Sequence, residues 1–441
     1  MANDDINAAL GGVVIRPGDP DWDAARRFHS GIGEPALVIR AASVDNVRSA
    51  VRYAAAEGVE VLVRSGGHSA WGSVPGGLTL DLAALADVAV EGTRVSIGGG
   101  AHWGAVAAVL ASHGLGISSG DTTSVGVGGL TLGGGIGLMV RAWGLACDQL
   151  VGVQLVTAEG DVVEATDATH PELMWALRGG GGNFGVVTRF DFEAHPLRAV
   201  FAAELGFEGD ARQVLRALRD IMTDAPRELT VTYMDVPPMD PSAPPGSSIG
   251  AVWAGDGETR AREALAPLLA VPGVVERDLG VRPYPDVLLE QPEFDPETPM
   301  PGFVGGNTLL RVLDDAAIER LVAFRESNPA SVLFLRSLGG AYGDVPQEKS
   351  AFPARDATWF AMAGAFDVPG MLDAAARTRA LGDWNEIESL GGGVYGNFTT
   401  STEPGWAERM YPRVTMARLA AVKREWDPQN VFRRNHNVLP A

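Results

Sequence analysis

The sequence predicts an α+β protein with more than one domain, and three observations support this: its length, its alternating elements and its glycine clusters. With 441 residues the chain exceeds what one typical hydrophobic core holds, so two or three domains are expected. Helical and strand-like patterns both recur along it. Glycine accounts for 56 residues, about 13% against the roughly 7% of average proteins. These glycines are clustered, which indicates backbone that closely approaches a ligand.

Hydrophobic periodicity and turn residues define the expected elements of the glycine-rich part of the chain. Ser43 or Asp45 is the expected cap of the first helix, and Gly58 its stop. The start of the chain therefore predicts strand, helix, strand. Helices are expected at residues 43–58, 103–113 and 172–177, and strands or hairpins at residues 36–40, 59–64, 77–82, 88–98, 152–158, 161–165 and 186–193.

The composition of the chain changes after His195–Pro196. Beyond this point glycine becomes less frequent, and expected helices alternate with expected strands. We therefore predict a domain boundary near residue 196. Beyond it, helices are expected at residues 211–222, 258–268, 316–326 and 414–426, strands at residues 229–234 and 250–254, and exposed proline-rich loops at residues 236–246 and 292–301.

The chain is acidic, with a formal net charge of −20 from 55 acidic and 35 basic residues. Nucleic acids and anionic membranes attract basic patches, so neither is an expected partner. No apolar run reaches the roughly 18 residues of a membrane helix, and the first residues do not resemble a signal peptide. A cytoplasmic protein is therefore expected. The single cysteine, Cys147, excludes an intrachain disulfide, and the histidines lack metal-ligand spacing.

Several common motifs are absent or misplaced. Residues 180–185 match G-x-G-x-x-G, but an expected strand follows them, whereas the dinucleotide fingerprint requires a helix there. The patterns of P-loops and zinc proteases do not occur.

Two glycine-rich segments are the candidate ligand sites. Residues 64–69 (RSGGHS) combine converging backbone N–H groups with the imidazole of His68, an arrangement that suits an anion such as a cofactor pyrophosphate. The alternative is that residues 64–69 form a plain turn with a surface histidine, because such a turn has the same sequence pattern. Residues 126–137 can lie flat against a planar ligand, or can form a glycine-rich strand packed closely on a neighbour.

Taken in order, these and later segments resemble the berberine bridge enzyme-like flavoproteins of the vanillyl-alcohol oxidase and p-cresol methylhydroxylase superfamily. Within that family the chain is similar to the bacterial 6-hydroxy-D-nicotine oxidase type. The resemblance extends from about residue 36 to 195 and from about 395 to 438, and it is weak between. The segments that carry it are 64–69, 77–82 (GLTLDL), 125–137 (VGVGGLTLGGGIG), 144–150 (GLACDQL), 175–188 (WALRGGGGNFGVVT), 339–346 (GGAYGDVP), 351–356 (AFPARD) and 418–432 (RLAAVKREWDPQNVF).

The resemblance implies a fold of three parts. Residues 1–196 would form an FAD-binding domain of the p-cresol methylhydroxylase type with two α/β subdomains. Residues 197–405 would form a substrate domain with a large antiparallel sheet and covering helices. Residues 406–441 would return to the FAD-binding domain.

The resemblance also implies how FAD is held. The family histidine that matches His68 carries an 8α-bond to the flavin. Thr122 stands where many members have a second, cysteinyl attachment, so a single covalent bond is expected; Cys147 lies elsewhere and is expected to be buried. A small residue, Val125, at the oxygen-gating position favours an oxidase. The expected cofactor contacts are Arg64, Ser65, Gly66, Gly67, His68, Ser69, Gly120, Asp121, Thr122, Val125, Gly128, Gly129, Gly135, Val187, Asn397 and Asn437.

Two tyrosines are candidates for catalysis. Tyr395 matches a family Tyr-x-Asn motif facing the flavin, and Tyr342 lies in the GGAYGDVP segment. Each is either a base or a side chain that only hydrogen-bonds substrate, because a phenol needs a lowered pKa to act as a base at neutral pH. Asn397 and Phe398 would line the pocket.

The expected function is an oxidase that transfers hydride from a small alcohol, amine or secondary metabolite to FAD, with molecular oxygen as acceptor and hydrogen peroxide as product. The alternatives are a dehydrogenase or an oxidative cyclase of natural-product biosynthesis, and, from another class, a flavin-binding sensor or carrier with little turnover. Specificity is expected to reside between residues 197 and 390.

Overall fold

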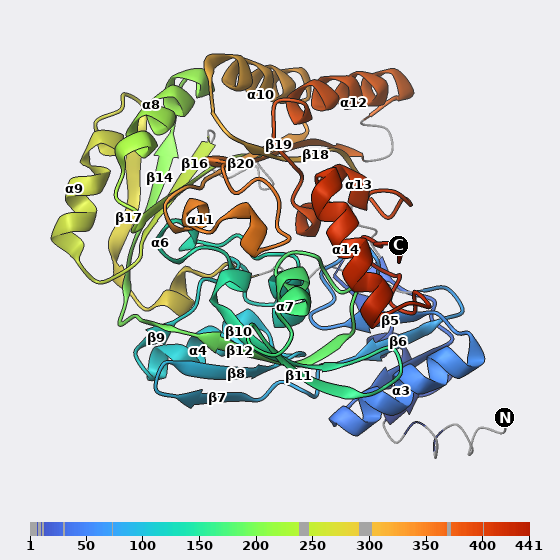
Figure 1. The fold of residues 1–441 in the computed structure, drawn as a ribbon. Helices are drawn as coiled ribbons and strands as arrows, with labels where there is room; N and C mark the ends of the chain where they lie inside the picture. The colour runs from blue at the N-terminus through green and yellow to red at the C-terminus, as the bar shows by residue number, and fades with distance from the viewer. Residues whose placement is uncertain are drawn as a thin grey trace.

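The computed structural model describes residues 7, 10, 13–29, 31–72, 74–237, 247–290, 302–367, 372–399 and 401–441. Most of the expected proline-rich loop 236–246, and all of the second one, 292–301, lie outside these residues. Figure 1 shows two layers of structure, a large sheet covered by helices and, below it, two smaller sheets.

The first small sheet has the order β1-β4-β6-β5, with strands Val13–Ile15, Leu37–Arg40, Leu78–Asp81 and Val61–Arg64. β4, β6 and β5 are parallel, and β1 pairs antiparallel with β4. Helix α3 (Val44–Glu57) connects β4 to β5. Ser43 caps it by accepting a hydrogen bond from the Asn46 N–H at 3.2 Å, and Gly58 ends it with φ of 65°. The predicted strand, helix and strand are confirmed as β4, α3 and β5, but β1 and other short elements precede them, so they are not the start of the chain.

The second small sheet is antiparallel and has the order β11-β10-β12-β8-β7. Its strands are Val162–Thr166, Leu150–Val156, Val186–Glu193, Arg94–Gly98 and Val88–Glu91. Helices α4 (Trp103–Ser112) and α7 (Pro171–Leu177) contribute to its core. Residues 180–185 lead into strand β12, so the rejection of a dinucleotide fingerprint is confirmed. Segment 126–137 contains helix α5 (Val127–Leu132), which excludes the alternative of a glycine-rich strand.

The large sheet is antiparallel, with the order β17-β14-β16-β15-β19-β20-β18. Its strands are Val274–Arg282, Val200–Phe207, Ser247–Trp253, Leu229–Asp235, Ser331–Ser337, Trp359–Asp367 and Gly302–Leu310. Helices α8 (Ala211–Asp224), α9 (Glu258–Leu269), α10 (Asp315–Ser327) and α12 (Ala374–Glu388) cover its outer face (Figure 1) and share a core with it. The expected α+β fold with a large antiparallel sheet is confirmed.

The chain then returns to the smaller sheets. Helices α13 (Ala407–Met410) and α14 (Arg413–Trp426) descend from the large sheet toward β5 and β6 (Figure 1). The predicted domain limits stay a prediction; they fall between β13 (His195–Pro196) and β14, and just before α13. The remaining short elements are α2 (Trp22–Ala25), β2 (Arg27–Phe28), β3 (Gly31–Ile32), β9 (Leu115–Gly116), α6 (Val140–Trp143), α11 (Ala341–Asp344) and the 3-10 helices η1 (Ala146–Gln149), η2 (Tyr284–Val287), η3 (Gln347–Lys349) and η4 (Gly396–Phe398).

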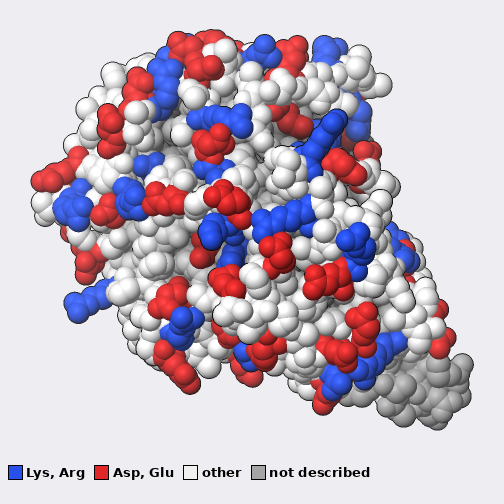
Figure 2. All heavy atoms as spheres, in the orientation of Figure 1, with Lys and Arg blue, Asp and Glu red and all other residues white. Residues whose placement is uncertain are grey.

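Acidic and basic side chains are interspersed on the face shown in Figure 2. Many arginines have carboxylate partners, as Arg212 has in Glu319 at 2.7 Å. Within the described residues, no helix is both long enough and apolar enough to cross a membrane.

Candidate functional site

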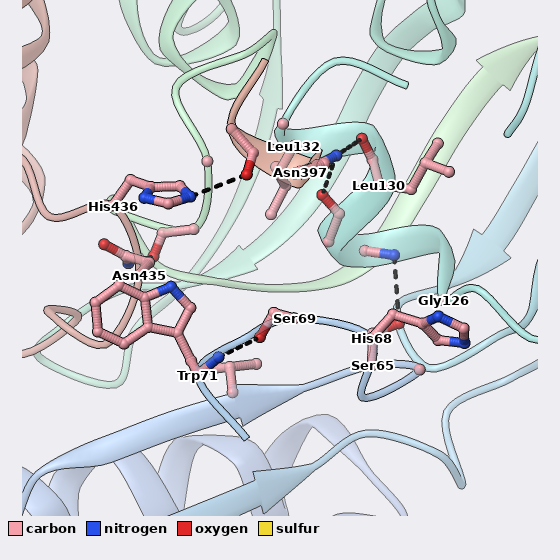
Figure 3. Close-up of a pocket in the computed structure, with 18 of the residues that line it drawn as sticks. Ser65, His68, Ser69, Trp71, Gly126, Leu130, Leu132, Asn397, Asn435 and His436 are labelled. Carbon is pink, nitrogen blue, oxygen red and sulfur yellow. Dashed lines mark hydrogen bonds between the residues drawn. The ribbon is translucent and has the colours of Figure 1, made fainter. Parts of the chain in front are cut away.

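A cavity of about 500 Å³ lies where the loops of the smaller sheets meet the C-terminal part of the chain. Its walls come from the loop after β5, the start of α5, the glycine loop before β12, η4 and residues 434–436. Figure 3 shows Ser65 and His68 below the first turn of α5, and His436 with Asn435 and Trp71 at the opposite end. Segments distant in sequence therefore build one site.

Arg64 holds the loop after β5 in place. Its guanidinium forms a nearly buried ion pair with Asp81 at 2.9 Å, and it donates to the backbone carbonyls of Ala25 and Arg27 at 2.7 and 3.0 Å. Arg64 lines the cavity, but these bonds direct its charge toward the protein. Its contribution is therefore to fix the shape of the loop.

The loop after β5 and the start of α5 approach each other so closely that the facing residues, Gly66 and Gly126, must both be glycine. A Cβ on Gly66 would lie 2.3 Å from the Gly126 nitrogen, and one on Gly126 would lie 2.2 Å from the Gly66 nitrogen. Ser65 reinforces the contact, because its hydroxyl donates to the Gly99 carbonyl at 2.7 Å and accepts from the Gly128 N–H at 3.3 Å. The result is a narrow cradle of backbone with little side-chain bulk.

His68 lies at one end of this cradle. Its Nε2 is 3.0 Å from the Ser124 hydroxyl, and its ring stacks on that of His29. Burial, together with the charges of the neighbouring His29 and His102, lowers the pKa of His68 to about 4. At neutral pH the imidazole is therefore uncharged, with a lone pair available for a ligand.

Thr122 and Asp121 line the cavity where it adjoins the large sheet. The Thr122 hydroxyl donates to Asp121 Oδ1 at 3.0 Å, and Asp121 Oδ2 pairs with Arg336 of β19 at 2.7 Å. Cys147 is fully buried outside the cavity lining, and burial raises the pKa of its thiol. Neither Thr122 nor Cys147 therefore presents a thiolate to the cavity.

Tyr395 and Tyr411 are buried tyrosines that line the cavity, and only Tyr395 was expected from the sequence. The Tyr395 hydroxyl oxygen accepts hydrogen bonds from the Gly135 N–H at 3.1 Å and from Asn397 Nδ2 at 2.9 Å. Asn397 also donates to the Leu130 carbonyl at the end of α5, at 3.2 Å (Figure 3). Burial raises the pKa of Tyr395 to about 12 although both hydrogen bonds oppose the rise. The phenol is therefore protonated at neutral pH.

Tyr342 lies elsewhere. Its hydroxyl donates to the Ala354 carbonyl at 2.8 Å, its ring is fully buried, and it is outside the cavity lining. Burial raises the pKa of Tyr342 as well. The structure thus separates the two candidate tyrosines and brings only Tyr395 to the site.

Most of the expected cofactor contacts come together at the cavity. Gly135 and Asn437 are outside its lining; the Gly135 N–H donates to Tyr395, and Asn437 Oδ1 is buried without a partner in the described residues. The expected residues that line it are Arg64, Ser65, Gly66, Gly67, His68, Ser69, Gly120, Asp121, Thr122, Val125, Gly128, Gly129, Val187 and Asn397.

Sequence reasoning did not identify His29, Trp71, Arg434, Asn435 and His436, which also line the cavity. Asn435 and His436 are adjacent to Asn437, an expected cofactor contact, so their positions in the sequence could have indicated that they line the cavity. No sequence pattern indicated His29, because it reaches the site from an N-terminal segment that contains none of the recognised motifs.

The residues at the cavity fit FAD. The glycine cradle admits a flat, phosphate-bearing molecule without clashes. Buried polar atoms with no partner in the described residues, namely His436 Nδ1 and Asn435 Oδ1, lie at its other end. Buried polar groups are normally hydrogen-bonded, so these atoms suit a ligand with hydroxyl and N–H groups.

Comparisons with known proteins agree with this fit. A model of the FAD binding domain matches residues 35–166, and a model described as berberine and berberine like matches residues 394–439. The chain is 31% identical to (R)-6-hydroxynicotine oxidase of Paenarthrobacter nicotinovorans over 98% of this chain and 97% of that protein. It is 28% identical to an uncharacterized FAD-linked oxidoreductase of Bacillus subtilis (strain 168), over 98% and 97%.

Solved structures show the same fold. The crystal structure of 6-hydroxy-D-nicotine oxidase from Arthrobacter nicotinovorans superposes with a TM-score of 0.82 at 27% identity, over 98% of both chains. Physcomitrella patens BBE-like 1 superposes with a TM-score of 0.84 at 23% identity, over 100% and 99%. The chain therefore belongs to the berberine bridge enzyme-like family of FAD-linked oxidoreductases, in the p-cresol methylhydroxylase superfamily, and FAD is its cofactor.

Proposed function

We propose that this protein is an oxidase that removes a hydride from a small organic molecule and uses molecular oxygen as its electron acceptor. The observation that carries the proposal is that one cavity joins the His68 cradle to a buried, hydrogen-bonded phenol, Tyr395. When bound, FAD accepts the hydride and passes two electrons to oxygen, which leaves as hydrogen peroxide.

His68 is the single covalent anchor of the flavin in this proposal. Its imidazole is neutral and Nε2 lies 3.0 Å from the Ser124 hydroxyl, so Nδ1, the other ring nitrogen, is the atom we assign to the bond. A glucooligosaccharide oxidase of the same fold has a 6-S-cysteinyl, 8α-N1-histidyl FAD. Thr122 cannot form the thioether of such a double attachment, and Cys147 is too deeply buried elsewhere.

Tyr395 acts in this proposal as a hydrogen-bond donor and not as a base. Gly135 and Asn397 donate to its oxygen, which leaves the phenolic O–H to donate to an oxygen or nitrogen of the substrate. Asn397 is a positioning residue, because it links the phenol to the end of α5. Val125 is a small residue in the cavity wall and supports oxygen access.

The test uses the purified holoprotein. We expect the flavin colour to stay in the pellet after acid precipitation, and photoreduced flavin to be reoxidised rapidly in air with one peroxide formed per flavin. Loss of all colour from the pellet would contradict the covalent anchor. Slow reoxidation by oxygen combined with rapid reoxidation by dye acceptors would indicate a dehydrogenase.

A further inference from the structure

The large sheet has two chemically different faces. One face forms the core beneath the covering helices. On the other, a row of directly opposed side chains crosses four strands, namely Met234, Phe334, Met362 and Asn307. Side chains alternate between faces along a strand, so Phe360 and Phe366 lie on the same side as Met362. Here the name apolar wall is used for Met234, Phe303, Phe334, Phe360, Met362 and Phe366, together with Phe398 of η4.

Aromatic contacts order three rings of the apolar wall, those of Phe334, Phe360 and Phe398. Phe360 makes three edge-to-face contacts, with ring centroids 5.9 Å from Phe334, 5.2 Å from Phe398 and 6.0 Å from Tyr395. Phe398 stacks on Tyr395 and on Phe334, with planes inclined by 28° in both pairs. Both geometries are favourable for aromatic rings, so this part of the wall is organised in advance of any ligand.

The apolar wall continues into the cavity. Phe398 and Tyr395 line the cavity directly, and Phe334 and Phe360 pack behind Phe398. Phe303, Met362, Phe366 and Phe398 remain partly exposed even though they belong to this cluster. A partly exposed apolar area that adjoins ordered rings and a cofactor cavity is typical of a ligand-binding surface.

Charge is nearly absent from the apolar wall. On this face of β15, β18, β19 and β20, Arg336 is the one charged side chain within the described residues, and Asp121 pairs with it at 2.7 Å. Arg336 is only 3% exposed, so it is not free to receive an anionic ligand. An anion placed here would lose its water without gaining a counter-charge.

We propose that the apolar wall binds the substrate of the proposed oxidase, and that this substrate carries an uncharged, flat aromatic ring. The inference rests on the proposed function. Ring edges, ring faces and methionine sulfur all form favourable contacts with an aromatic ligand. A sugar needs hydrogen-bond partners across its whole surface, and the wall supplies few of them.

Binding to the oxidised holoprotein tests this inference without turnover. The probes are 2-naphthol, its carboxylate analogue 2-naphthoate, and cellobiose, each titrated while the flavin absorption spectrum and the fluorescence of the naphthyl probes are recorded. We expect 2-naphthol to bind at least about tenfold more tightly than either of the others, in the range that one unmatched polar group produces. Equal or tighter binding of cellobiose or 2-naphthoate would overturn the inference.

Substitutions locate the binding surface. Met362→Gln keeps the side-chain volume but adds an amide to a partly exposed position, and Phe334→Leu removes one ring. Each should weaken 2-naphthol binding about tenfold. Val275→Gln, at an exposed position on edge strand β17 of the same sheet, is the control and should bind as the wild type does. Wild-type affinity in both wall variants would refute the assignment.

The two proposals fail separately. If photoreduced flavin reoxidises rapidly in air but cellobiose binds in preference to 2-naphthol, the oxidase survives and the apolar wall assignment does not. If 2-naphthol binding depends on Met362 and Phe334 but the flavin does not react with oxygen, the wall is confirmed as a binding surface and the oxidase is refuted.

Discussion

The rings of His29 and His68 stack with their centroids 4.5 Å apart and their planes inclined by 13°. The His29 N–H donates to the Gly67 carbonyl at 2.9 Å, which docks this N-terminal segment on the anchor loop. Beside it, the ring of Phe28 occupies the space that a Cβ on Gly72 would need, with a separation of 2.2 Å. The N-terminal segment thus shields the imidazole that we propose as the flavin anchor.

Replacing His29 by alanine should make flavin attachment to His68 sensitive to pH. Burial lowers the pKa of His68 to about 4, so in the wild type the imidazole stays neutral and reactive down to about pH 5. Without the stacked ring, water reaches His68 and its pKa rises toward the ordinary value of about 6.5. Attachment should then slow as the pH falls through that raised pKa.

The measurement is a time course of covalent flavin in acid-precipitated protein, after apoprotein is mixed with FAD at several values between about pH 5 and 8. His29→Phe is the matched control, because it keeps an aromatic ring over His68, and its rate should stay flat with pH. A flat profile for His29→Ala would show that His29 does not control the protonation of His68.

Tyr395→Phe and Tyr342→Phe should separate catalysis from stability. Tyr395→Phe removes the proposed donor to substrate and should slow flavin reduction by about 10²-fold, as loss of one preorganised donor does. Because the pKa of Tyr395 is about 12, the wild-type rate should show no tyrosine-dependent step below about pH 10. Anaerobic stopped-flow reduction measures both quantities.

Tyr342→Phe removes one buried hydrogen bond, to the Ala354 carbonyl. It should lower the unfolding free energy by about 1 kcal/mol and leave flavin reduction close to the wild-type rate. If the rate of flavin reduction fell as far in Tyr342→Phe as in Tyr395→Phe, Tyr342 would have to be considered a catalytic residue again.

Asp121→Asn should destabilise the junction between the flavin loop and the large sheet. Arg336 is buried and its guanidinium pairs with Asp121, so the substitution leaves a buried cation without its counter-charge. We expect a loss of about 3 kcal/mol in unfolding free energy, and a double-mutant cycle with Arg336→Gln should give a clear coupling energy. The exposed pair Arg227–Asp344 is the control and should couple by less than about 1 kcal/mol. Equal coupling in the two pairs would contradict a structural role for Asp121.

The part of the site that sequence reasoning located is built from local signals. Glycines in the loop after β5 are required by the contact between Gly66 and Gly126, and that requirement is visible as a motif. The helix caps Ser43 and Gly58 are local as well. His29 reaches the cavity through tertiary packing alone, which no local pattern records.

The large sheet was expected from the family resemblance, but most of its strands were not located. Edge strand β17 is largely exposed, and edge strand β18 contains Gly305 and Gly306, so neither shows a regular apolar alternation. Strand β19 is buried on both faces and therefore reads as an apolar run that fits helix or strand. The apolar wall consequently could not be assembled from sequence, because its register is set by pairing between distant strands.

Lys423→Met should detach the C-terminal segment from the flavin site. Lys423 and Asp427 are both fully buried, and the ammonium donates to the Asp427 carboxylate at 2.6 Å and to the carbonyls of Asn183 and Phe432. Removing the cation leaves a buried carboxylate unpaired, which costs about 3–5 kcal/mol. We expect a fall of that size in unfolding free energy by denaturant titration.

The same substitution should expose residues 430–438 to limited proteolysis, because Lys423 bridges α14 to the glycine loop that holds this segment. Lys349→Met, which removes an exposed lysine, is the control and should change neither stability nor cleavage. If Lys423→Met lowered stability without raising cleavage of the C-terminal segment, the Lys423–Asp427 pair would stabilise the FAD-binding domain but would not position Asn435 and His436. Faster cleavage together with weaker FAD retention in a His68→Ala background would establish that this buried pair holds the C-terminal wall of the cavity.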